Sequence, residues 1–419
     1  MGLCWNSKAA NIMVKPAQKA PETPVMNEKL LLFLLAMVQF THIIDFMIIM
    51  PLGKQFMQLF DITPQQFSVI VSAYALSAFA VGFLSAMYID RFDRKKALAF
   101  TYLGFTLGTF ACGLADDYYV FLAARSITGA FGGVLSALVL SIIGDAIPLK
   151  RRGQAMGVVM TAFSAASVVG VPAGLYLAAS FSWRTTFFVI GSIAAVVLAL
   201  IFFFIPALNR HLEGAGVQRN PFRVIGNIFK DGNQRMALLF TTILMLGHFT
   251  IIPFIAPYMQ LNIGFSDHQV TYIYAVGGTL TIFLLPFFGR LADRFGHAQV
   301  FTFASLGALA SIYAITNLDT ASIALALCVT SSFFVVASGR NVPATTMVTA
   351  VVRPESRGSF MSVRTSINQM AMGVSSFVAG LIVTENADGS LSDYDYVGYI
   401  AVVMSLIAVA LAWRLRAVE

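Results

Sequence analysis

The chain has few charged residues and few cysteines for its 419 residues. Charged residues make up 11% of the sequence and hydrophobic residues 58%, whereas soluble domains carry roughly 25% charged residues. This composition excludes an ordinary soluble protein and predicts an all-α, polytopic membrane protein. The three cysteines, Cys4, Cys112 and Cys328, form neither a disulfide framework nor a zinc spacing. No metal site and no cofactor are expected.

Motifs of nucleotide-driven transport and of intramembrane enzymes are also missing. The sequence has no G-x-x-x-x-G-K-[ST] phosphate loop and no interhelical segment long enough for a nucleotide-binding domain. It has neither a nucleophile elbow nor an H-E-x-x-H metal motif, which argues against an enzyme. Any transport must therefore be secondary, and a non-transporting membrane sensor is the alternative from another class.

Long apolar runs predict twelve transmembrane helices, since about 18 apolar residues suffice to cross a bilayer. The runs lie near 29–51, 66–89, 97–115, 119–143, 154–180, 185–206, 236–259, 269–289, 298–316, 321–348, 359–384 and 397–413. They form two six-helix bundles, 29–206 and 236–413, separated by a polar linker at 207–235. A tail at 1–28 and a short end at 414–419 complete the organisation.

The linker contains one amphipathic stretch. It begins at Asn220-Pro221, and the apolar residues Ile225 and Phe229 lie three and seven positions after Phe222. This spacing suits a short helix on the membrane surface. A flexible tether is the alternative.

Basic residues gather on one side of the predicted bundle. Outside the spans, only Lys54 and Arg184 fall on the other side, and only Arg125 and Arg340 lie within helices. The positive-inside rule then places both termini in the cytoplasm. The chain is expected to be a monomer in a bacterial inner membrane. The net charge of +7 faces anionic lipid, and no nucleic-acid partner is expected.

The two bundles repeat each other. Asp90-Arg91 matches Asp293-Arg294, Arg152-Gly153 matches Arg357-Gly358, and His42 with Pro51 matches His248 with Pro257, all at an offset of about 205 residues. Repeats with the same orientation are related by an axis along the membrane normal and enclose a central site. The predicted fold is therefore two six-helix repeats around a central cavity.

Asp45 is the only acidic residue well inside a long apolar run. A carboxylate there is costly and usually functional, so Asp45 is the expected proton site. Asp45 and Arg125 each lie roughly 9 Å below the outer membrane boundary, at 1.5 Å per residue, and are expected to pair. Arginine favours the charged acid and burial favours the neutral acid, a competition suited to a switch. A permanent structural ion pair is the alternative.

The second half lacks this acid, because aligning His42 with His248 places Asp45 opposite Ile251. His42, one turn before Asp45, is expected to share its proton or contact substrate, with hydrogen-bonded packing as the alternative for both histidines. Arg340 either binds an anionic group of the substrate or extends to the cytoplasmic surface. Further candidates for the substrate cavity are Tyr74, His248 and Asn341.

Several motifs resemble those of the major facilitator superfamily, over nearly the whole chain. The family's loop signature G-x-x-x-D-R-x-G-R-K-K is similar to Ala86-MYI-Asp90-Arg91-FD-Arg94-KK and to Gly289-RLA-Asp293-Arg294-FG-His297. The first copy lacks both glycines, and the second has His297 in place of the later basic residue. A family arginine in the fourth helix matches Arg125.

The closest resemblance is to bacterial twelve-helix drug:proton antiporters and sugar-efflux permeases. Gly170-Val-Pro172-Ala-Gly174 resembles their fifth-helix G-P-x-x-G motif, with Val171 as an insertion. The resemblance implies alternating access and export of small amphipathic molecules, drug-like or sugar-like, in exchange for protons. Proton-coupled uptake of a small solute is the alternative.

The loop-signature charges are expected to form gates. Asp90 and Arg94 lie one turn apart at a cytoplasmic helix end, where countercharges can hold an inner gate shut. Asp145 is the nearest plausible acid for Arg94, and Arg91, Asp293 and Arg294 complete the set. The position equivalent to Asp145 in the second half is Ala350, so that clamp is expected to be weaker. A role in topology alone is the alternative.

Overall fold

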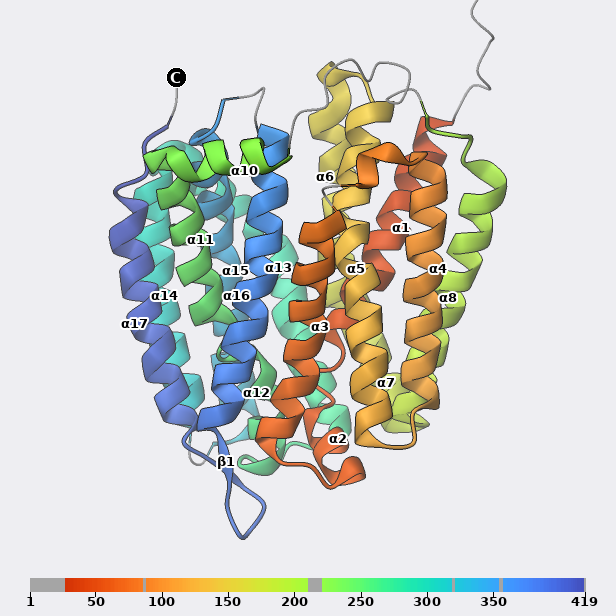
Figure 1. Ribbon diagram of the computed structural model, residues 1–419. Helices are drawn as coiled ribbons and strands as arrows, with labels where there is room; N and C mark the ends of the chain where they lie inside the picture. Colours follow the sequence, from red (N-terminus) through yellow and green to blue (C-terminus); the bar gives the residue numbers. More distant parts are fainter. Residues whose placement is uncertain (1–26, 86–87, 210–220, 319–320, 354–356, 418–419) are drawn as a thin grey trace, which may run out of the picture.

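The computed structural model describes residues 27–85, 88–209, 221–318, 321–353 and 357–417. Within these ranges the chain is almost entirely helical, and its long helices run side by side in one bundle (Figure 1). The helix α10 (Pro221–Lys230) lies across one end of the bundle, and the short helix α2 (Gly53–Phe60) lies at the opposite end. These two ends are called here the α10 end and the α2 end.

The N-terminal half contains the first six predicted spans. Its elements are α1 (Glu28–Met47), α2, α3 (Pro64–Ser85), the 3₁₀ turn η1 (Ile89–Arg91), α4 (Arg94–Leu114), α5 (Tyr118–Ala146), α6 (Leu149–Ala165), the π-helical turn η2 (Ala166–Gly170), α7 (Val171–Ser180) and α8 (Trp183–Phe204). The first predicted span is shorter than expected, because α1 ends at Met47 and a turn through Pro51 leads into α2. Proline has no backbone N–H to continue a helix.

The C-terminal half repeats this pattern after α10. Its elements are α11 (Gly232–Phe249), α12 (Ile252–Leu261), α13 (Asp267–Phe295), α14 (His297–Thr316), α15 (Ile323–Ala350), α16 (Arg357–Ile382), the strands β1 (Thr384–Glu385) and β2 (Leu391–Ser392), and α17 (Tyr394–Ala412). The break between α11 and α12 precedes Pro253 and corresponds to the break between α1 and α2. Residues 221–230 of the linker form the helix α10, so the predicted short helix is present there and the flexible tether is wrong for this stretch.

Eleven helical segments in the described part of the chain are long and apolar enough to cross a membrane. The remaining predicted span, the eleventh in sequence order, is α16, which has 26 residues but is too polar to meet the same measure, because it contains Arg364, Asn368 and Gln369. The prediction of an all-α membrane protein built from two repeated six-helix halves is confirmed. Side chains such as Phe100, Phe203 and Phe303 are exposed, as expected where lipid surrounds a protein.

Several of the few acidic residues begin helices. The side chains of Asp93, Asp117 and Asp231 accept hydrogen bonds from backbone N–H groups in the first turns of α4, α5 and α11. These N–H groups have no partner within the helix, and a carboxylate also favours the positive end of the helix dipole. Capping thus explains these three acids, whereas Asp45 lies within α1 and caps no helix.

Small residues allow the helices to approach closely. A Cβ atom on Gly133 of α5 would overlap the carbonyl oxygen of Ala78 in α3, and a Cβ on Gly82 would lie 3.1 Å from the carbonyl oxygen of Gly133. Between the halves, Gly373 of α16 packs on Leu76 of α3. Helix association in lipid relies on such close packing because lipid tails are as apolar as the side chains.

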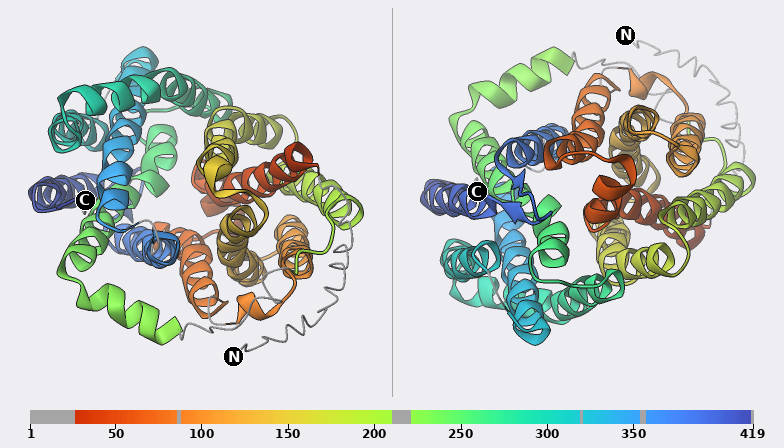
Figure 2. Two further views of the ribbon diagram at one scale, coloured as in Figure 1. Left: turned by 90° about the horizontal axis from the view of Figure 1, so that it is seen from above. Right: turned by 90° about the horizontal axis from the view of Figure 1, so that it is seen from below.

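The two halves share a hydrophobic core only toward the α2 end. One core cluster joins residues of both halves there, including Phe56 and Phe67 with Phe254 and Met259. Toward the α10 end, a second cluster draws only on the N-terminal half and a third only on the C-terminal half. Figure 2 shows α3 beside α16 on one flank and α7 beside α13 on the other. The halves therefore meet at the α2 end and diverge toward the α10 end.

Candidate functional site

Asp45 lies on α1, two residues before the helix ends at Met47. Its side chain is 0% exposed. Ile44 and Ile48, on either side of it, belong to the shared apolar core. A carboxylate in such surroundings needs charge compensation and hydrogen bonds from its neighbours.

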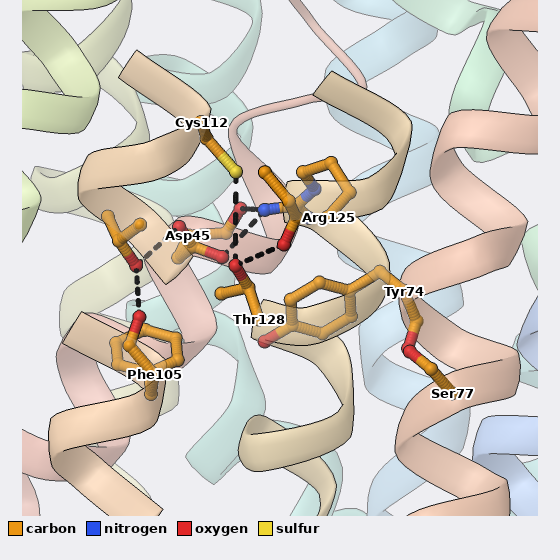
Figure 3. Close-up of polar contacts among 9 residues, drawn as sticks. Asp45, Tyr74, Ser77, Phe105, Cys112, Arg125 and Thr128 are labelled. Carbon is orange, nitrogen blue, oxygen red and sulfur yellow. Dashed lines mark hydrogen bonds and ion pairs between the residues drawn. The ribbon is translucent and has the colours of Figure 1, made fainter. Parts of the chain in front are cut away.

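Arg125 of α5 provides the charge compensation. Its Nη1 donates to Asp45 Oδ2 at 2.7 Å and to the backbone carbonyl oxygen of Asp45 at 3.2 Å (Figure 3). The side chain of Arg125 is 1% exposed and that of Asp45 is 0% exposed. The pairing expected from helix depth is therefore present, and it joins the first and fourth predicted spans.

Thr109 of α4 completes the shell around the carboxylate. Its hydroxyl donates to Asp45 Oδ1 at 3.2 Å and also lies 3.1 Å from the carbonyl oxygen of Phe105. This threonine was not predicted from sequence. Thr101 and Thr106 lie on the same helix, and their hydroxyls, like that of Thr109, donate to backbone carbonyls one turn earlier. Which hydroxyl meets Asp45 depends on how α4 is rotated about its axis.

Tyr74 of α3 lies against Arg125 rather than facing away from it. The guanidinium carbon is 4.3 Å from the centre of the Tyr74 ring, a distance at which cation and ring attract each other. Figure 3 shows the Tyr74 ring beside Arg125, with Thr128 next to the ring and Cys112 farther from it. Helices α1, α3, α4 and α5 therefore all contribute to one buried polar cluster.

His42 lies one turn before Asp45 and is also buried. Neither of its ring nitrogens, nor the Tyr74 hydroxyl, has a hydrogen-bond partner among the described residues. Gly132 of α5 lies between them, since a Cβ atom there would be 2.7 Å from Tyr74 Oη and 2.9 Å from His42 Nε2. Two uncommitted polar groups thus converge on a position that only glycine can occupy without displacing them.

The glycine motif at 170–174 packs directly on the helix that carries Asp45. Gly170 accommodates the side chain of Ile44, and Gly174 lies where a Cβ atom would be 2.8 Å from Ile48 Cδ1. The π-helical turn at Ala166–Gly170 precedes Pro172, which lies in the first turn of α7. The motif therefore sets the contact of α7 with α1 on both sides of the acid.

The cavity candidates of the C-terminal half occupy different environments. His248 is half-buried and stacks on Phe333 with ring centres 5.9 Å apart. Arg340 is 1% exposed, and its Nη1 donates to Ser405 Oγ at 3.0 Å. Arg340 thus does not extend to the surface, and that alternative is wrong for this conformation. Asn341 is half-buried, and Ile251, opposite Asp45 in the repeat, is buried in the core.

The first copy of the loop signature contains a second ion pair. Arg94 Nε lies 2.9 Å from Asp145 Oδ2, with the arginine side chain 6% exposed. Both residues belong to the N-terminal half, so this pair fastens α4 to α5 and does not bridge the two halves. Arg91 is exposed. The side chain of Asp90, with residues 86–87, lies outside the part of the chain that the structure describes.

The second copy of the signature has no comparable pair. Asp293 and Arg294 are both exposed, and neither forms an ion pair with a residue in the described ranges. The guanidinium carbon of Arg294 lies 5.2 Å from the centre of the Phe295 ring. The two halves are therefore unequal at the α10 end, as the replacement of Asp145 by Ala350 predicts.

At the α2 end a polar contact joins the two halves. Asp267, in the first turn of α13, accepts hydrogen bonds from Gln55 of α2 at 3.2 Å and from Gln260 of α12 at 2.8 Å. Beside it, the rings of Phe67 and Phe254 meet edge to face at 5.9 Å. This contact was not predicted from sequence, because α2 was not predicted as a separate helix.

Replacing Asp267 with alanine should weaken the closure of the α2 end. Hydrogen bonds to a charged group contribute about 1.5–3 kcal/mol each, and Gln55 would lose its partner across the halves. We expect a cysteine introduced at the buried position Phe254 to react at least about tenfold faster with a membrane-impermeant thiol reagent, since about 1.4 kcal/mol corresponds to a factor of ten. Asp388→Ala, in the exposed hairpin between β1 and β2, is the control. An unchanged reaction rate would show that apolar packing alone keeps this end closed.

Comparison with known proteins covers nearly the whole chain. The family model described as Major Facilitator Superfamily matches residues 35–250 and 237–419. An uncharacterised MFS-type transporter of Bacillus subtilis, YbcL, is 25% identical over 350 residues, covering 82% of this chain and 84% of that one. A vacuolar membrane amino acid uptake transporter of Schizosaccharomyces pombe, fnx2, is 33% identical over 138 residues, which are 33% of this chain and only 24% of its own length.

Solved structures share the fold at low sequence identity. A D-xylose-proton symporter superposes with a TM-score of 0.75 at 14% identity, covering 92% of this chain and 97% of that chain. A bacterial homologue of the human lysosomal transporter Spinster, in an inward-facing and occupied conformation, gives a TM-score of 0.71 at 17% identity, covering 92% and 96%. At these identities the likeness extends to the fold alone.

Proposed function

The chain belongs to the major facilitator superfamily of membrane transporters, and we propose that it exports small amphipathic molecules by proton antiport, with Asp45 as the proton site. The observation that carries this proposal is the fully buried Asp45–Arg125 pair at 2.7 Å. Ionisable groups inside a membrane protein mark proton and substrate paths. Among the described residues, Asp45 is the only Asp or Glu whose side chain is buried.

Protonation of Asp45 is a change that the surrounding helices can respond to. A neutral acid attracts Arg125 much less strongly than a carboxylate does, so the guanidinium then depends more on the carbonyl oxygen of Asp45 and on the ring of Tyr74. Because Ile44 and Ile48 fit against Gly170 and Gly174, a shift of α1 is passed to α7, which contacts α13 of the other half. Protonation of Asp45 thereby favours one of two arrangements of the halves. Coupling between a proton site and a substrate site requires such a difference between the two arrangements.

The described conformation corresponds to one state of alternating access. The halves share a core at the α2 end and diverge at the α10 end. We assign the α10 end to the cytoplasm, because the predicted cytoplasmic segments carry most of the basic residues. The protein is then inward-facing, in a bacterial inner membrane, and acts as a monomer.

The direction of coupling is tested by flux into proteoliposomes with an imposed pH gradient. In antiport, substrate moves against the protons and accumulates on the acidic side. Proton-coupled uptake is the second candidate, suggested by the similarity to an amino acid uptake transporter and to a D-xylose-proton symporter, and it predicts accumulation on the alkaline side. Accumulation that survives a protonophore would count against both forms of proton coupling.

A further inference from the structure

Two arginines of the C-terminal half, Arg340 and Arg364, lie away from the surface without an acidic partner in the described part of the chain. Arg340 bonds only Ser405, and its Nε and Nη2 are buried without a hydrogen-bond partner. Arg364 of α16 lies 3.4 Å from Thr345 Oγ1 and 3.8 Å from Met361 Sδ, and its Nε is likewise unpartnered. In the described ranges no carboxylate forms an ion pair with either arginine. Arg125 in the other half, by contrast, is neutralised by Asp45.

An uncompensated guanidinium away from water is costly, by an effective several kcal/mol. Arg340 is enclosed within its half, whereas Arg364 is only half-buried and its neighbour Thr345 on α15 is exposed. Arg364 is therefore the arginine that a molecule entering the bundle can reach. It lies seven residues into α16, roughly 10 Å from the helix end at 1.5 Å per residue.

Arg364 lies where the two halves have separated. Helix α16 meets α3 of the N-terminal half at Gly373 and Gly380, where Leu76 and Ser68 lie against it. Arg364 precedes Gly373 by two and a half turns, on the stretch of α16 nearer the α10 end. A charged side chain at this depth faces the bundle interior or a watery cavity, and not lipid.

The next turn of α16 adds hydrogen-bond acceptors. Asn368 Oδ1 and Gln369 Oε1 are buried without a partner in the described structure. These residues and Arg364 also make α16 the most polar of the twelve predicted spans. A guanidinium beside uncommitted amide oxygens suits a molecule that carries both an anionic group and a hydrogen-bond donor.

We propose that Arg364, with Thr345 and Asn368, forms a subsite that binds the carboxylate of a small organic acid bearing a neighbouring N–H or O–H donor. This deepens the proposed transport function and rests on it for the use of the site. Arg364 would recognise the anionic oxygens of the ligand, and the phosphate of a lipid headgroup carries such oxygens as well. The small carboxylate is favoured over a lipid because Arg364 lies roughly 10 Å inside α16, at 1.5 Å per residue, on a stretch that faces the bundle interior and not lipid.

The test measures binding to the purified full-length protein in neutral detergent by thermal unfolding. The probes are a panel of amino and hydroxy carboxylates, phenylalanine and mandelate among them, each compared with its amide. At least one carboxylate should raise the unfolding temperature saturably where its amide does not. Arg364→Gln should raise the half-saturating concentration at least about tenfold, and Arg364→Lys should recover part of the affinity. Arg357→Gln, at the exposed start of the same helix, is the matched control.

A second arm adds phosphatidylglycerol micelles in place of the carboxylates. A stabilisation by this lipid that depends on Arg364, with no response to any carboxylate, would overturn the proposal in favour of a headgroup site. A panel in which no carboxylate outperforms its amide, or unchanged binding in Arg364→Gln with Arg357→Gln normal, would overturn it as well. This binding assay contains no proton gradient, so its result is independent of the proteoliposome flux assay. If a pH gradient drives no flux but carboxylate binding still depends on Arg364, the antiport proposal is wrong and the subsite proposal stands.

Discussion

Asp45→Asn should abolish substrate accumulation driven by a pH gradient. One pH unit corresponds to 1.36 kcal/mol, so a gradient of about two units supports roughly hundredfold accumulation for a carrier that exchanges one proton per substrate. Asparagine preserves the shape of the side chain and retains an oxygen for Arg125 and Thr109, but it has no proton to exchange. Proteoliposomes with the variant should reach equal concentrations on both sides, while exchange of labelled for unlabelled substrate continues.

Asp116→Asn is the control for this experiment. Asp116 forms an ion pair with Arg184 at 2.9 Å, and its side chain is 85% exposed, so it matches the chemistry of the substitution without the burial. Gradient-driven accumulation should be unchanged in this variant. If Asp45→Asn accumulates substrate as the parent does, Asp45 is not the proton site, and the pair with Arg125 is a structural contact between α1 and α5.

The fold and part of the site could be predicted from sequence because they depend only on the positions of residues along each helix. Apolar length predicts the spans, repeated motifs predict two halves, and depth predicts that Asp45 and Arg125 lie level. The breaks after Met47 and Phe249 were not predicted, because an apolar run continues through both of them.

Contacts that depend on helix rotation could not be predicted. Most spans here are apolar on every side, so the sequence does not indicate which face turns inward. The donation from Thr109 to Asp45, the stacking of Tyr74 on Arg125 and the fit of Gly132 between two polar side chains all require that rotation. The same limit left two alternatives open for Arg340, whose side chain is bonded to Ser405 within its own half.

The largest effect on stability is expected for Arg125→Met. Methionine fills much of the same volume but leaves the buried carboxylate of Asp45 with only the Thr109 hydroxyl, and removing one partner of a buried ion pair costs about 3–5 kcal/mol. The double variant Asp45→Asn/Arg125→Met has no buried charge at this position and should recover most of that loss. The measurement is the free energy of unfolding in detergent for the parent, the two single variants and the double variant.

The four proteins together separate charge from packing. Arg184→Met removes an arginine that is 36% exposed from its pair with Asp116, and it should cost less than about 1 kcal/mol because exposed ion pairs contribute little. A double variant as unstable as Arg125→Met would place the loss in the packing of Arg125 against Tyr74 and not in the stranded carboxylate. Recovery of stability without recovery of gradient-driven transport would instead support a role of the ion pair in coupling, since an uncharged pair of side chains then serves the fold equally well.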